Sequence, residues 1–460
     1  MGVERRDGQE GGWELAKSKE VQPASVFEET MQVGSVRGRW PFAEPAIWTD
    51  PMLTTLERGV KGGKWYSLVD KAFSLRSLRA AFAKVKANGG AKGVDGVTIK
   101  RFENDLEGNL ERLHRELMGG TYRPKPVRRV WIPKPGSNEK RPLGIPTVRD
   151  RVAQTSVKAA LEPIFEKEFL DESFGFRPGR SCHKALSRVW RFLRDGKVFV
   201  VEADFRKFFD TIPHQVILDG LKKKVSDGRL LGLINLYLEA GVMDGWTWEP
   251  VNEGTPQGSV VSPLLANIAL HGLDQIAKEQ GYDIVRYADD FVILCQMGEE
   301  SQGAMETVRE WTASVGLTLH PDKTRVVDYG NGESFDFLGF TFCGGKYFPR
   351  SKSLMNLRGK IRELTPRKSG RSMKEVIRKL NPVLRGWFNH FKPCSEGRFK
   401  GIDYYVSRRL RSLIYVQHHL KPPANGNYRG RWPMKFFHDA GLYSMVQAKR
   451  KTSILSEANH

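Results

Sequence analysis

The sequence predicts an α+β protein in which antiparallel strands come first and a set of helices follows. Two short apolar runs, at residues 284–287 and 291–294, are separated by a turn and are typical of a β-hairpin. A further apolar run covers residues 198–205. Beyond residue 346, apolar side chains recur every three or four positions over residues 354–364 and 373–380, which indicates amphipathic helices.

Three aspartates lie at the ends of these predicted strands. Asp289 and Asp290 fill the hairpin turn, and Asp204 lies near the end of the run at 198–205. Neighbouring carboxylates repel each other and need a cation, and oxygen ligands with room for substrate phosphates suit Mg²⁺. Phosphoryl transfer with two metal ions draws its acids from more than one strand, as here. Taken alone, the Asp289–Asp290 pair is equally compatible with an ordinary polar turn.

Composition limits the class of protein. A chain of 460 residues with 40% hydrophobic content is long enough for two to four folded domains. Its four cysteines have no Cys-x-x-Cys spacing, which argues against a disulfide framework or a structural zinc site and favours a reducing compartment. No apolar run approaches the roughly 20 residues of a membrane helix, and the N-terminus lacks the apolar core of a signal peptide. No membrane partner is therefore expected.

The positive charge is concentrated at one end of the chain. The net charge is +21, and residues 346–460 carry 26 Lys or Arg against 6 Asp or Glu, which gives this segment +20. A solvated basic surface is one interpretation. A block this unbalanced more often marks a polyanionic partner such as nucleic acid, whose counterions are released on binding.

The first third of the chain combines helices with a basic hairpin. Residues 1–70 are rich in Gly, Pro and mixed charges and are interpreted as a partly disordered extension. Apolar spacing from Leu75 predicts a helix, and a second helix is predicted over residues 102–117. Alternating basic and apolar residues at 122–136 and 140–146 predict a β-hairpin with a basic face.

Two blocks rich in glycine and proline follow a predicted helix over residues 149–165. The block at 174–181, Phe-Gly-Phe-Arg-Pro-Gly-Arg-Ser, predicts a tight loop whose Arg177 and Arg180 either contact phosphate or have structural roles. The block at 254–268 contains two glycines and a proline that let the backbone approach a ligand closely. Its Ser-Pro pair predicts a helix start, with the serine as the cap and the proline at the first position.

These blocks, in this order, resemble those of group II intron reverse transcriptase/maturases over residues 71–425. Tyr-Ala-Asp-Asp at 287–290 resembles motif C of reverse transcriptases, and residues 203–210 resemble motif A. The other matching blocks are 254–268 (motif B), 317–324 (motif D), 337–340 (the primer-grip turn) and 380–391 (the maturase, or X, domain). The optional Cys-rich His-Asn-His endonuclease domain of that family has no counterpart.

The resemblance implies a right-hand polymerase with fingers, an antiparallel palm sheet and an α-helical thumb. Residues 1–70 would be an N-terminal extension, 71–345 the fingers and palm, and 346–425 the thumb or maturase (X) domain. Residues 426–460 would be a short basic tail, a candidate remnant of a DNA-binding region.

The resemblance also implies the catalytic residues. Asp204, Asp289 and Asp290 would hold two Mg²⁺ ions, with the backbone carbonyl of Phe205 as a further ligand. Lys323 matches a lysine that protonates the pyrophosphate leaving group, and a positioned general acid contributes about 10²–10⁴-fold. A solvated lysine is the alternative.

Substrate contacts carry over in the same way. Lys134 and Arg141 match the triphosphate-contacting positions of the fingers. Both residue types suit this role, since Arg offers a planar fork to phosphate and Lys a point charge. Gln257 would lie near the template–nucleotide pair, and Gly258 would allow a close approach. Phe209, five residues after Asp204, would exclude a 2′-hydroxyl and so select dNTPs.

Phe209 also has a structural alternative. Phe208 and Phe209 could both belong to the core, and one of them is expected to, because adjacent strand residues face opposite ways.

The expected function is RNA-directed DNA polymerisation by a bacterial cytoplasmic protein associated with nucleic acid. Its partners would be group II intron RNA as template and splicing substrate, a DNA primer or target, and dNTPs. Two alternatives remain open: a splicing cofactor that chiefly binds RNA, and a related enzyme repurposed for defence or repair. The oligomeric state is not predicted.

Overall fold

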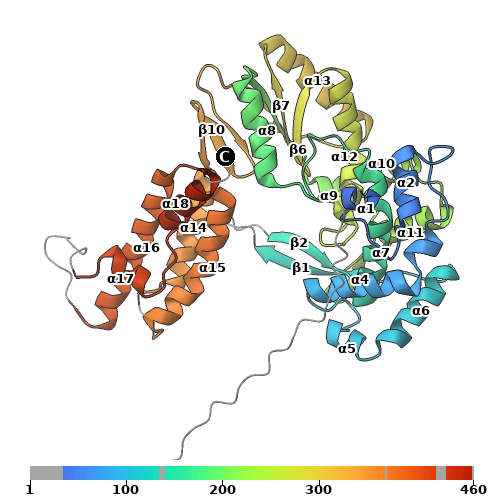
Figure 1. Ribbon diagram of the computed structural model, residues 1–460, viewed down its shortest axis with the longest axis horizontal. Coiled ribbons are helices and arrows are strands. Elements are labelled where there is room, and N and C mark those ends of the chain that lie inside the picture. The colour runs from blue at the N-terminus through green and yellow to red at the C-terminus, as the bar shows by residue number, and fades with distance from the viewer. Residues whose placement is uncertain (1–34, 134–139, 368–369, 421–430, 458–460) are drawn as a thin grey trace, which may run out of the picture.

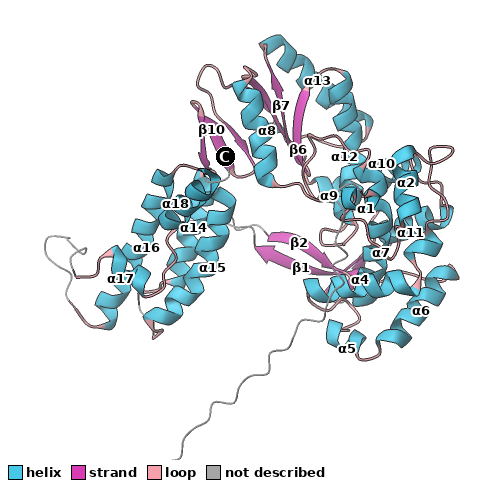
Figure 2. Cartoon of the chain, viewed as in Figure 1, coloured by secondary structure: helices cyan, strands magenta, loops and turns pink. Residues whose placement is uncertain are grey.

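The computed structural model describes residues 35–133, 140–367, 370–420 and 431–457 (Figure 1). Up to residue 349 the described chain contains both helices and strands, and the remaining described segments are helical. Figure 2 shows an all-helical group at the left of the view, strands in its centre and upper part, and a further group of helices at the right. The predicted α+β class with a helical C-terminal domain is confirmed.

Seven helices build the fingers around one apolar core. They are α1 (Val36–Arg39), α2 (Asp50–Arg58), α3 (Val69–Ala72), α4 (Leu75–Asn88), α5 (Ile99–Glu103), α6 (Leu106–Met118) and α7 (Val148–Glu166). Trp48 and Leu53 are fully buried in that core, so residues 35–70 are folded onto the fingers. Residues 1–34 of the predicted extension lie outside the described residues.

The second predicted helix is divided in two. α5 ends at Glu103, Asn104 keeps helical dihedral angles as its cap, and Asp105, with φ −129° and ψ 57°, interrupts the helix before α6 begins at Leu106. Asn and Asp compete with the helical backbone through their own side chains, which favours helix ends over helix interiors. Here Asn109 donates from Nδ2 to the Phe102 carbonyl at 3.0 Å and ties the two pieces together.

The basic hairpin forms as predicted and belongs to a four-stranded sheet. The strands are β1 (Val127–Pro133), β2 (Lys140–Ile145), β4 (Val242–Asp244) and β5 (Thr247–Glu249), in the order β2-β1-β4-β5. β1 and β2 are antiparallel, whereas β1 pairs with β4 in parallel. Figure 1 shows the hairpin extending from the fingers toward the helical C-terminal domain.

The palm is a four-stranded antiparallel sheet with helices on both faces. Its strands are β3 (Phe199–Asp204), β6 (Asp283–Tyr287), β7 (Asp290–Cys295) and β8 (Arg325–Asp328), in the order β6-β7-β3-β8. One face packs on α12 (Ser262–Glu279) and α13 (Gly298–Ser314), and the other on α8 (Cys182–Arg194). Alternate strand residues therefore enter two different cores.

The cap of α12 differs by one residue from the prediction. The helix includes Ser262 and is preceded by Val261, so the serine is not the cap. Its hydroxyl contacts the Thr255 hydroxyl at 2.5 Å and donates to the Pro256 carbonyl at 3.2 Å. The side chain that was expected to cap the helix is thus hydrogen-bonded to the glycine-rich block that starts at residue 254.

A small sheet joins the palm to the C-terminal domain. Strands β9 (Phe335–Phe337), β10 (Phe340–Cys343) and β11 (Lys346–Pro349) lead into α14 (Ser351–Leu364). The domain continues with α15 (Met373–Phe391), α16 (Glu396–Gln417), α17 (Met434–Asp439) and α18 (Met445–Glu457). One apolar cluster runs from the α8 face of the palm sheet through β9 and β10 into these helices.

The predicted division at residue 426 does not coincide with a structural boundary. Phe437 and Met445 are fully buried in the core of the helical domain. The carboxylate of Asp403 on α16 accepts bonds from the Ser444 hydroxyl and from the N–H groups of Met445 and Val446. Within residues 431–457, α17 and α18 are therefore part of the packed thumb. Across the described ranges, no helix is both long and apolar enough to cross a bilayer.

Candidate active site

The three predicted acids lie together at one end of the palm sheet. Asp204 is the last residue of β3 and is the register partner of Asp290, the first residue of β7. Cross-strand partners have Cβ atoms about 5 Å apart. Asp289 precedes Asp290 in the turn that joins β6 to β7. The structure thus brings together the three carboxylates that the sequence singled out.

A buried arginine fixes the turn that carries Asp289. Arg286 is fully buried, and its Nε and Nη2 donate to the Asp274 carboxylate on α12 at 2.7 and 2.5 Å. Its Nη1 donates to Asn267 Oδ1 at 2.9 Å and to the Ala288 carbonyl at 3.0 Å. Ala288 has a φ of 59°, a left-handed conformation that costs free energy for a residue with a Cβ. The arginine bonds hold the backbone in that conformation.

The loop at 174–181 buttresses the same turn. Asn267 Nδ2 donates to the Gly175 carbonyl at 2.7 Å, and Phe174 N donates to the Arg286 carbonyl at 2.8 Å. A Cβ at Gly175 would lie 2.2 Å from the Ala288 nitrogen, so only glycine fits there. The loop and the acid turn are therefore packed backbone to backbone.

The two arginines of this loop have structural roles in the described chain. Arg177 is buried and donates to Glu166 at 2.8 and 2.9 Å and to the carbonyls of Leu170 and Ser173. Arg180 donates to the Asp171 carboxylate at 2.6 Å. Of the two interpretations of the sequence, these contacts favour the structural one.

Burial and mutual repulsion make the acids hard to ionise together. Burial, with a smaller contribution from the charges of Asp204 and Asp289, raises the pKa of Asp290 to about 7, against the opposing hydrogen bond from Leu338 N. Burial likewise raises the pKa of Asp289, although nearby Arg141 lowers it. Carboxylates held in this way gain most from a bound cation, so the donor set suits a hard metal ion.

Lys323 supplies positive charge at one of these acids. It lies in the short helix η1 (Pro321–Lys323), and its Nζ is 2.5 Å from Asp204 Oδ2. The segment that precedes η1 is anchored to β3, because His320 N donates to the Asp204 carbonyl at 2.8 Å. On the other side of Phe205, Arg206 N donates to the Thr318 carbonyl at 2.8 Å. The two hydrogen bonds between these segments therefore involve the neighbours of Phe205 and not the Phe205 carbonyl.

The side chains as they stand do not form a ready metal cage. Among the described residues, no group of three or more His, Cys, Asp or Glu side chains is arranged to hold a metal ion. Two of the three acids have other partners: Asp204 Oδ2 pairs with Lys323, and Asp290 accepts from Leu338 N at 3.3 Å. A metal ion that bound Asp204 through Oδ2 would compete with Lys323.

Of the predicted substrate-contact residues, Arg141, Gln257 and Gly258 lie in the described part of the chain. Arg141 is an exposed residue of β2 and lies near enough to Asp289 to affect its pKa, whereas Lys134 lies outside the described residues. The Gln257 carbonyl accepts from Gly144 N at 2.7 Å. A Cβ at Gly258, whose φ is 106°, would lie 2.4 Å from the Gly144 carbonyl oxygen. The close approach that Gly258 permits is therefore to the backbone of β2.

Phe208 and Phe209 differ in burial, for a reason other than the one predicted. They begin the single turn of α9 (Phe208–Thr211), not a continuing strand. Phe208 is buried in the core, and Phe209 is partly exposed and packs edge-on against it with ring centroids 5.4 Å apart. The Phe209 carbonyl accepts from Thr255 N at 2.7 Å, which ties this turn to the glycine-rich block.

One contact to the acids had no sequence signal. Leu338, between β9 and β10, has a φ of 50° and donates its N–H to Asp290 Oδ2. Its carbonyl lies 3.2 Å from Nε2 of His390 on α15, and the His390 carbonyl lies 2.8 Å from Nε2 of His183 on α8. A carbonyl only accepts, so these bonds require a proton on each Nε2. A chain of hydrogen bonds thus links Asp290 to a thumb helix.

We expect Arg286→Ala to destabilise the chain by about 3–5 kcal/mol, because it leaves the Asp274 carboxylate buried without its partner. Urea unfolding measures this loss. Arg325→Ala is the matched control, since Arg325 pairs with Glu202 but its side chain is 55% exposed. Exposed pairs contribute about 0–1 kcal/mol. Equal losses for the two variants would contradict the role of Arg286.

We expect the protein without Mg²⁺ to lose stability as the pH rises from 5 to 7. Asp290 has a pKa of about 7 when folded, whereas an unfolded Asp titrates near 4. The folded chain therefore holds a proton that the unfolded chain has lost, and the free energy of unfolding falls by on the order of 2 kcal/mol over this window. Urea unfolding in EDTA at several pH values measures the slope.

The Asp290→Asn variant tests whether Asp290 causes this dependence of the free energy of unfolding on pH. The amide keeps an oxygen for Leu338 N and has no proton to lose, so its slope should be shallower than that of the wild type. Asp322→Asn, at an exposed aspartate of η1, should leave the slope unchanged. Identical slopes in the wild type and Asp290→Asn would show that another group titrates.

Comparison with known proteins agrees with the two halves of this structure. Residues 132–342 match the family described as "Reverse transcriptase (RNA-dependent DNA polymerase)". Residues 354–432 match the family described as "Group II intron, maturase-specific domain". The first match begins at the end of β1 and covers β2 and the palm, and the second covers most of the helical domain.

Relatives among characterised sequences give the same result. Protein YkfC of Escherichia coli is 36% identical over 290 residues, which is 54% of this chain and 74% of YkfC. The group II intron-encoded protein LtrA of Lactococcus lactis is 41% identical over 201 residues, 43% of this chain but 33% of LtrA. Among solved structures, telomerase from Candida albicans aligns over 64% of this chain and 61% of its own, with 14% identity and a TM-score of 0.39. From the two family matches and the YkfC alignment, this chain belongs to the group II intron reverse transcriptase/maturase family.

Proposed function

We propose that this chain is an RNA-directed DNA polymerase that also binds intron RNA through its helical C-terminal domain. The observation that supports this proposal best is the convergence of Asp204, Asp289 and Asp290 at one end of the palm sheet. The reaction would be attack of a primer 3′-hydroxyl on the α-phosphorus of a dNTP, with release of pyrophosphate.

Asp204, Asp289 and Asp290 would hold two Mg²⁺ ions, with the Phe205 carbonyl as a further ligand. When bound, these ions would supply Lewis-acid activation of the hydroxyl and charge stabilisation of pyrophosphate. The protein's own contribution is geometric. The Arg286 network fixes the turn at Asp289, and the Leu338 N–H orients the Asp290 carboxylate. Pre-set donors of this kind need no reorganisation during the reaction.

Lys323 would act in two ways. Beside Asp204 it neutralises one carboxylate of the cluster, at a distance of 2.5 Å. If Asp204 turns toward a metal ion, the ammonium is released next to the leaving group. It could then donate a proton to pyrophosphate, as a general acid within hydrogen-bond reach.

The fingers would hold the incoming nucleotide. Arg141 reaches toward Asp289 from β2, and with Lys134 it would contact the triphosphate. Gln257 and Gly258 are held against β2 by the Gly144 contact, which would set the template–nucleotide pair against the hairpin. Phe209 would exclude a 2′-hydroxyl from the sugar site.

The helical domain would bind intron RNA for splicing and retrohoming. Its segment carries +20 of the chain's +21 net charge, which supports a polyanionic partner. A DNA primer or target strand would bind the same positive surface, with α17 and α18 as candidates for the DNA contact. The four cysteines are all free thiols, which suits the bacterial cytoplasm.

A second candidate function is a splicing cofactor in which RNA binding is the whole activity. The same charge asymmetry favours it, together with the absence of a ready metal cage among the described side chains. The two functions differ in a direct measurement of DNA synthesis.

We expect purified protein to extend a DNA primer on an RNA template with Mg²⁺ and dNTPs, and Asp289→Ala to abolish this extension. Loss of several kcal/mol of charge stabilisation corresponds to a fall of roughly a thousandfold. Asp322→Ala, at an exposed acid of η1, is the matched control and should retain activity. If well-folded wild-type protein does not extend the primer but binds intron RNA, the splicing-cofactor function is the correct one.

We expect Phe209→Val to raise the use of rNTPs relative to dNTPs by about tenfold or more, because a smaller side chain admits the 2′-hydroxyl. The measured quantity is the ratio of kcat/KM for the two nucleotides. This ratio does not depend on how much of the variant is folded. An unchanged ratio would assign Phe209 to the core alone.

A further inference from the structure

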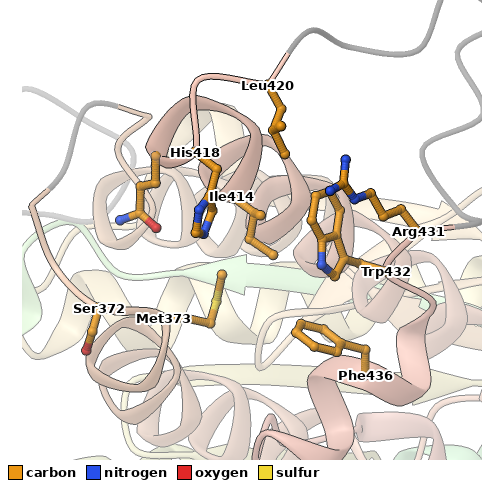
Figure 3. Close-up of a pocket in the computed structure, with 9 residues that line it drawn as sticks. Ser372, Met373, Ile414, His418, Leu420, Arg431, Trp432 and Phe436 are labelled. Carbon is orange, nitrogen blue, oxygen red and sulfur yellow. The ribbon is translucent and has the colours of Figure 1, made fainter.

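The helical domain contains a cavity of about 650 Å³ at the end of the domain that carries α17. It lies between the start of α15, the end of α16 and the segment that leads into α17 (Figure 3). Figure 1 shows this end turned away from β6 and β7, so the cavity is separate from the acid cluster. The lining residues are Ser372, Met373, Ile414, Gln417, His418, Leu420, Arg431, Trp432 and Phe436.

Apolar and aromatic walls with a polar rim characterise this cavity. Trp432 and Phe436 form one side, and Met373 lies across from them (Figure 3). The indole of Trp432 is held in place, because it packs edge-on against Tyr415 with centroids 5.1 Å apart and its carbonyl accepts from Arg411 Nε at 2.7 Å. A fixed aromatic face is available before any ligand binds.

The rim offers charge and hydrogen-bonding groups. The guanidinium of Arg431 lies over the Trp432 ring at 5.0 Å from its centroid, at an exposed position. His418 is also exposed at the rim. A planar guanidinium that lies over an indole has a flat face of its own, on which another aromatic ring can stack.

A second cavity of about 570 Å³ adjoins the first and is basic. The two share Ser372 and Gln417 as lining residues. The second is lined additionally by Arg367, Arg371 and His419, without an acidic residue in its lining. Arg362, Arg367 and Arg408 also surround Arg409, so like charges are concentrated here. An aromatic cavity thus stands next to a cationic one.

We propose that these two cavities bind one unpaired nucleotide of RNA, the base in the aromatic cavity and its phosphates in the basic one. Sequence-tolerant RNA sites stack a splayed-out base on aromatic rings and Arg planes and neutralise the backbone beside it. The volume is in the range of small-molecule sites. The occupant is RNA because residues 354–432 match the maturase-specific domain. The proposal rests on the RNA-binding half of the proposed function.

A duplex cannot occupy this site without flipping a base. Paired bases are stacked inside the helix, and their faces are not available to Trp432 and Phe436. The site therefore distinguishes single-stranded loops, bulges and ends from duplex RNA, whereas the basic surface around it does not.

The test compares Phe436→Ala with Tyr404→Ala in the full chain. Both side chains are aromatic, lie in the same domain and are 42% and 41% exposed, but only Phe436 lines the cavity. Binding is measured by fluorescence anisotropy with an unstructured RNA of about 12 nucleotides, the same sequence as a duplex, and the DNA equivalent. We expect Phe436→Ala to weaken single-stranded RNA binding by about 5- to 100-fold with little change for the duplex, and Tyr404→Ala to change neither.

A second readout reports the base itself. With 2-aminopurine in the RNA, binding should quench its fluorescence by stacking, and the quenching should be lost in Phe436→Ala and retained in Phe436→Tyr, which keeps the ring. Equal weakening for single strand and duplex, no weakening, or an equal effect on DNA overturns the proposal. Primer extension on a preformed RNA–DNA hybrid separates this result from the polymerase, because Phe436→Ala should keep extension and Asp289→Ala should lose it while still binding RNA.

Discussion

The buried ion pair between Arg286 and Asp274 is the constraint on which the acid cluster depends. A charge that is fully buried is tolerated only when paired and hydrogen-bonded, and here all described bonds of the guanidinium are directed to one turn and its support. The pair joins β6 to α12, and through Asn267 it reaches Gly175. The strained backbone at Ala288 is therefore determined from three sides, as expected where strain is stored at a functional site. The hydrogen bonds of the Arg286 network offset the free energy stored in the turn.

Hydrogen bonds and apolar contacts also connect the acid cluster in the palm to the thumb. Asp290 receives one hydrogen bond from Leu338, and the Leu338 carbonyl is held by His390 of α15. The apolar cluster that contains Phe340 and Phe391 is shared between the small sheet and that helix, with ring centroids 4.9 Å apart. Movement of α15 relative to the palm therefore changes the surroundings of Asp290. In this way the helical domain and the acid cluster are connected through Leu338 and His390.

Much of this arrangement could be predicted from sequence because its signals are local. The hairpin around Asp289, the strand ending at Asp204 and the helix from Leu75 all follow from apolar periodicity. Contacts between distant segments carry no such signal. The link from Leu338 to His390 spans 52 residues and depends on a left-handed residue that is neither Gly nor Asn. Gly258 was predicted to allow close approach to a ligand; the neighbour that the structure gives it, the Gly144 backbone in β2, could not be identified from sequence.

Positive charge is distributed unevenly between the acid cluster and the helical domain. Lys323 pairs with Asp204, and Arg141 and Arg286 lower the pKa of Asp289, whereas the helical domain carries most of the net positive charge. Neutralising the cluster with further arginines would remove the need for a metal ion and with it the chemistry that the ion supplies. The arginines of the thumb are instead crowded together at Arg409, where their repulsion lowers its pKa after burial does. Each surface thus concentrates charge of one sign, negative at the acid cluster and positive on the helical domain. RNA backbone on the thumb and metal ions on the palm would each relieve repulsion that folding alone leaves in place.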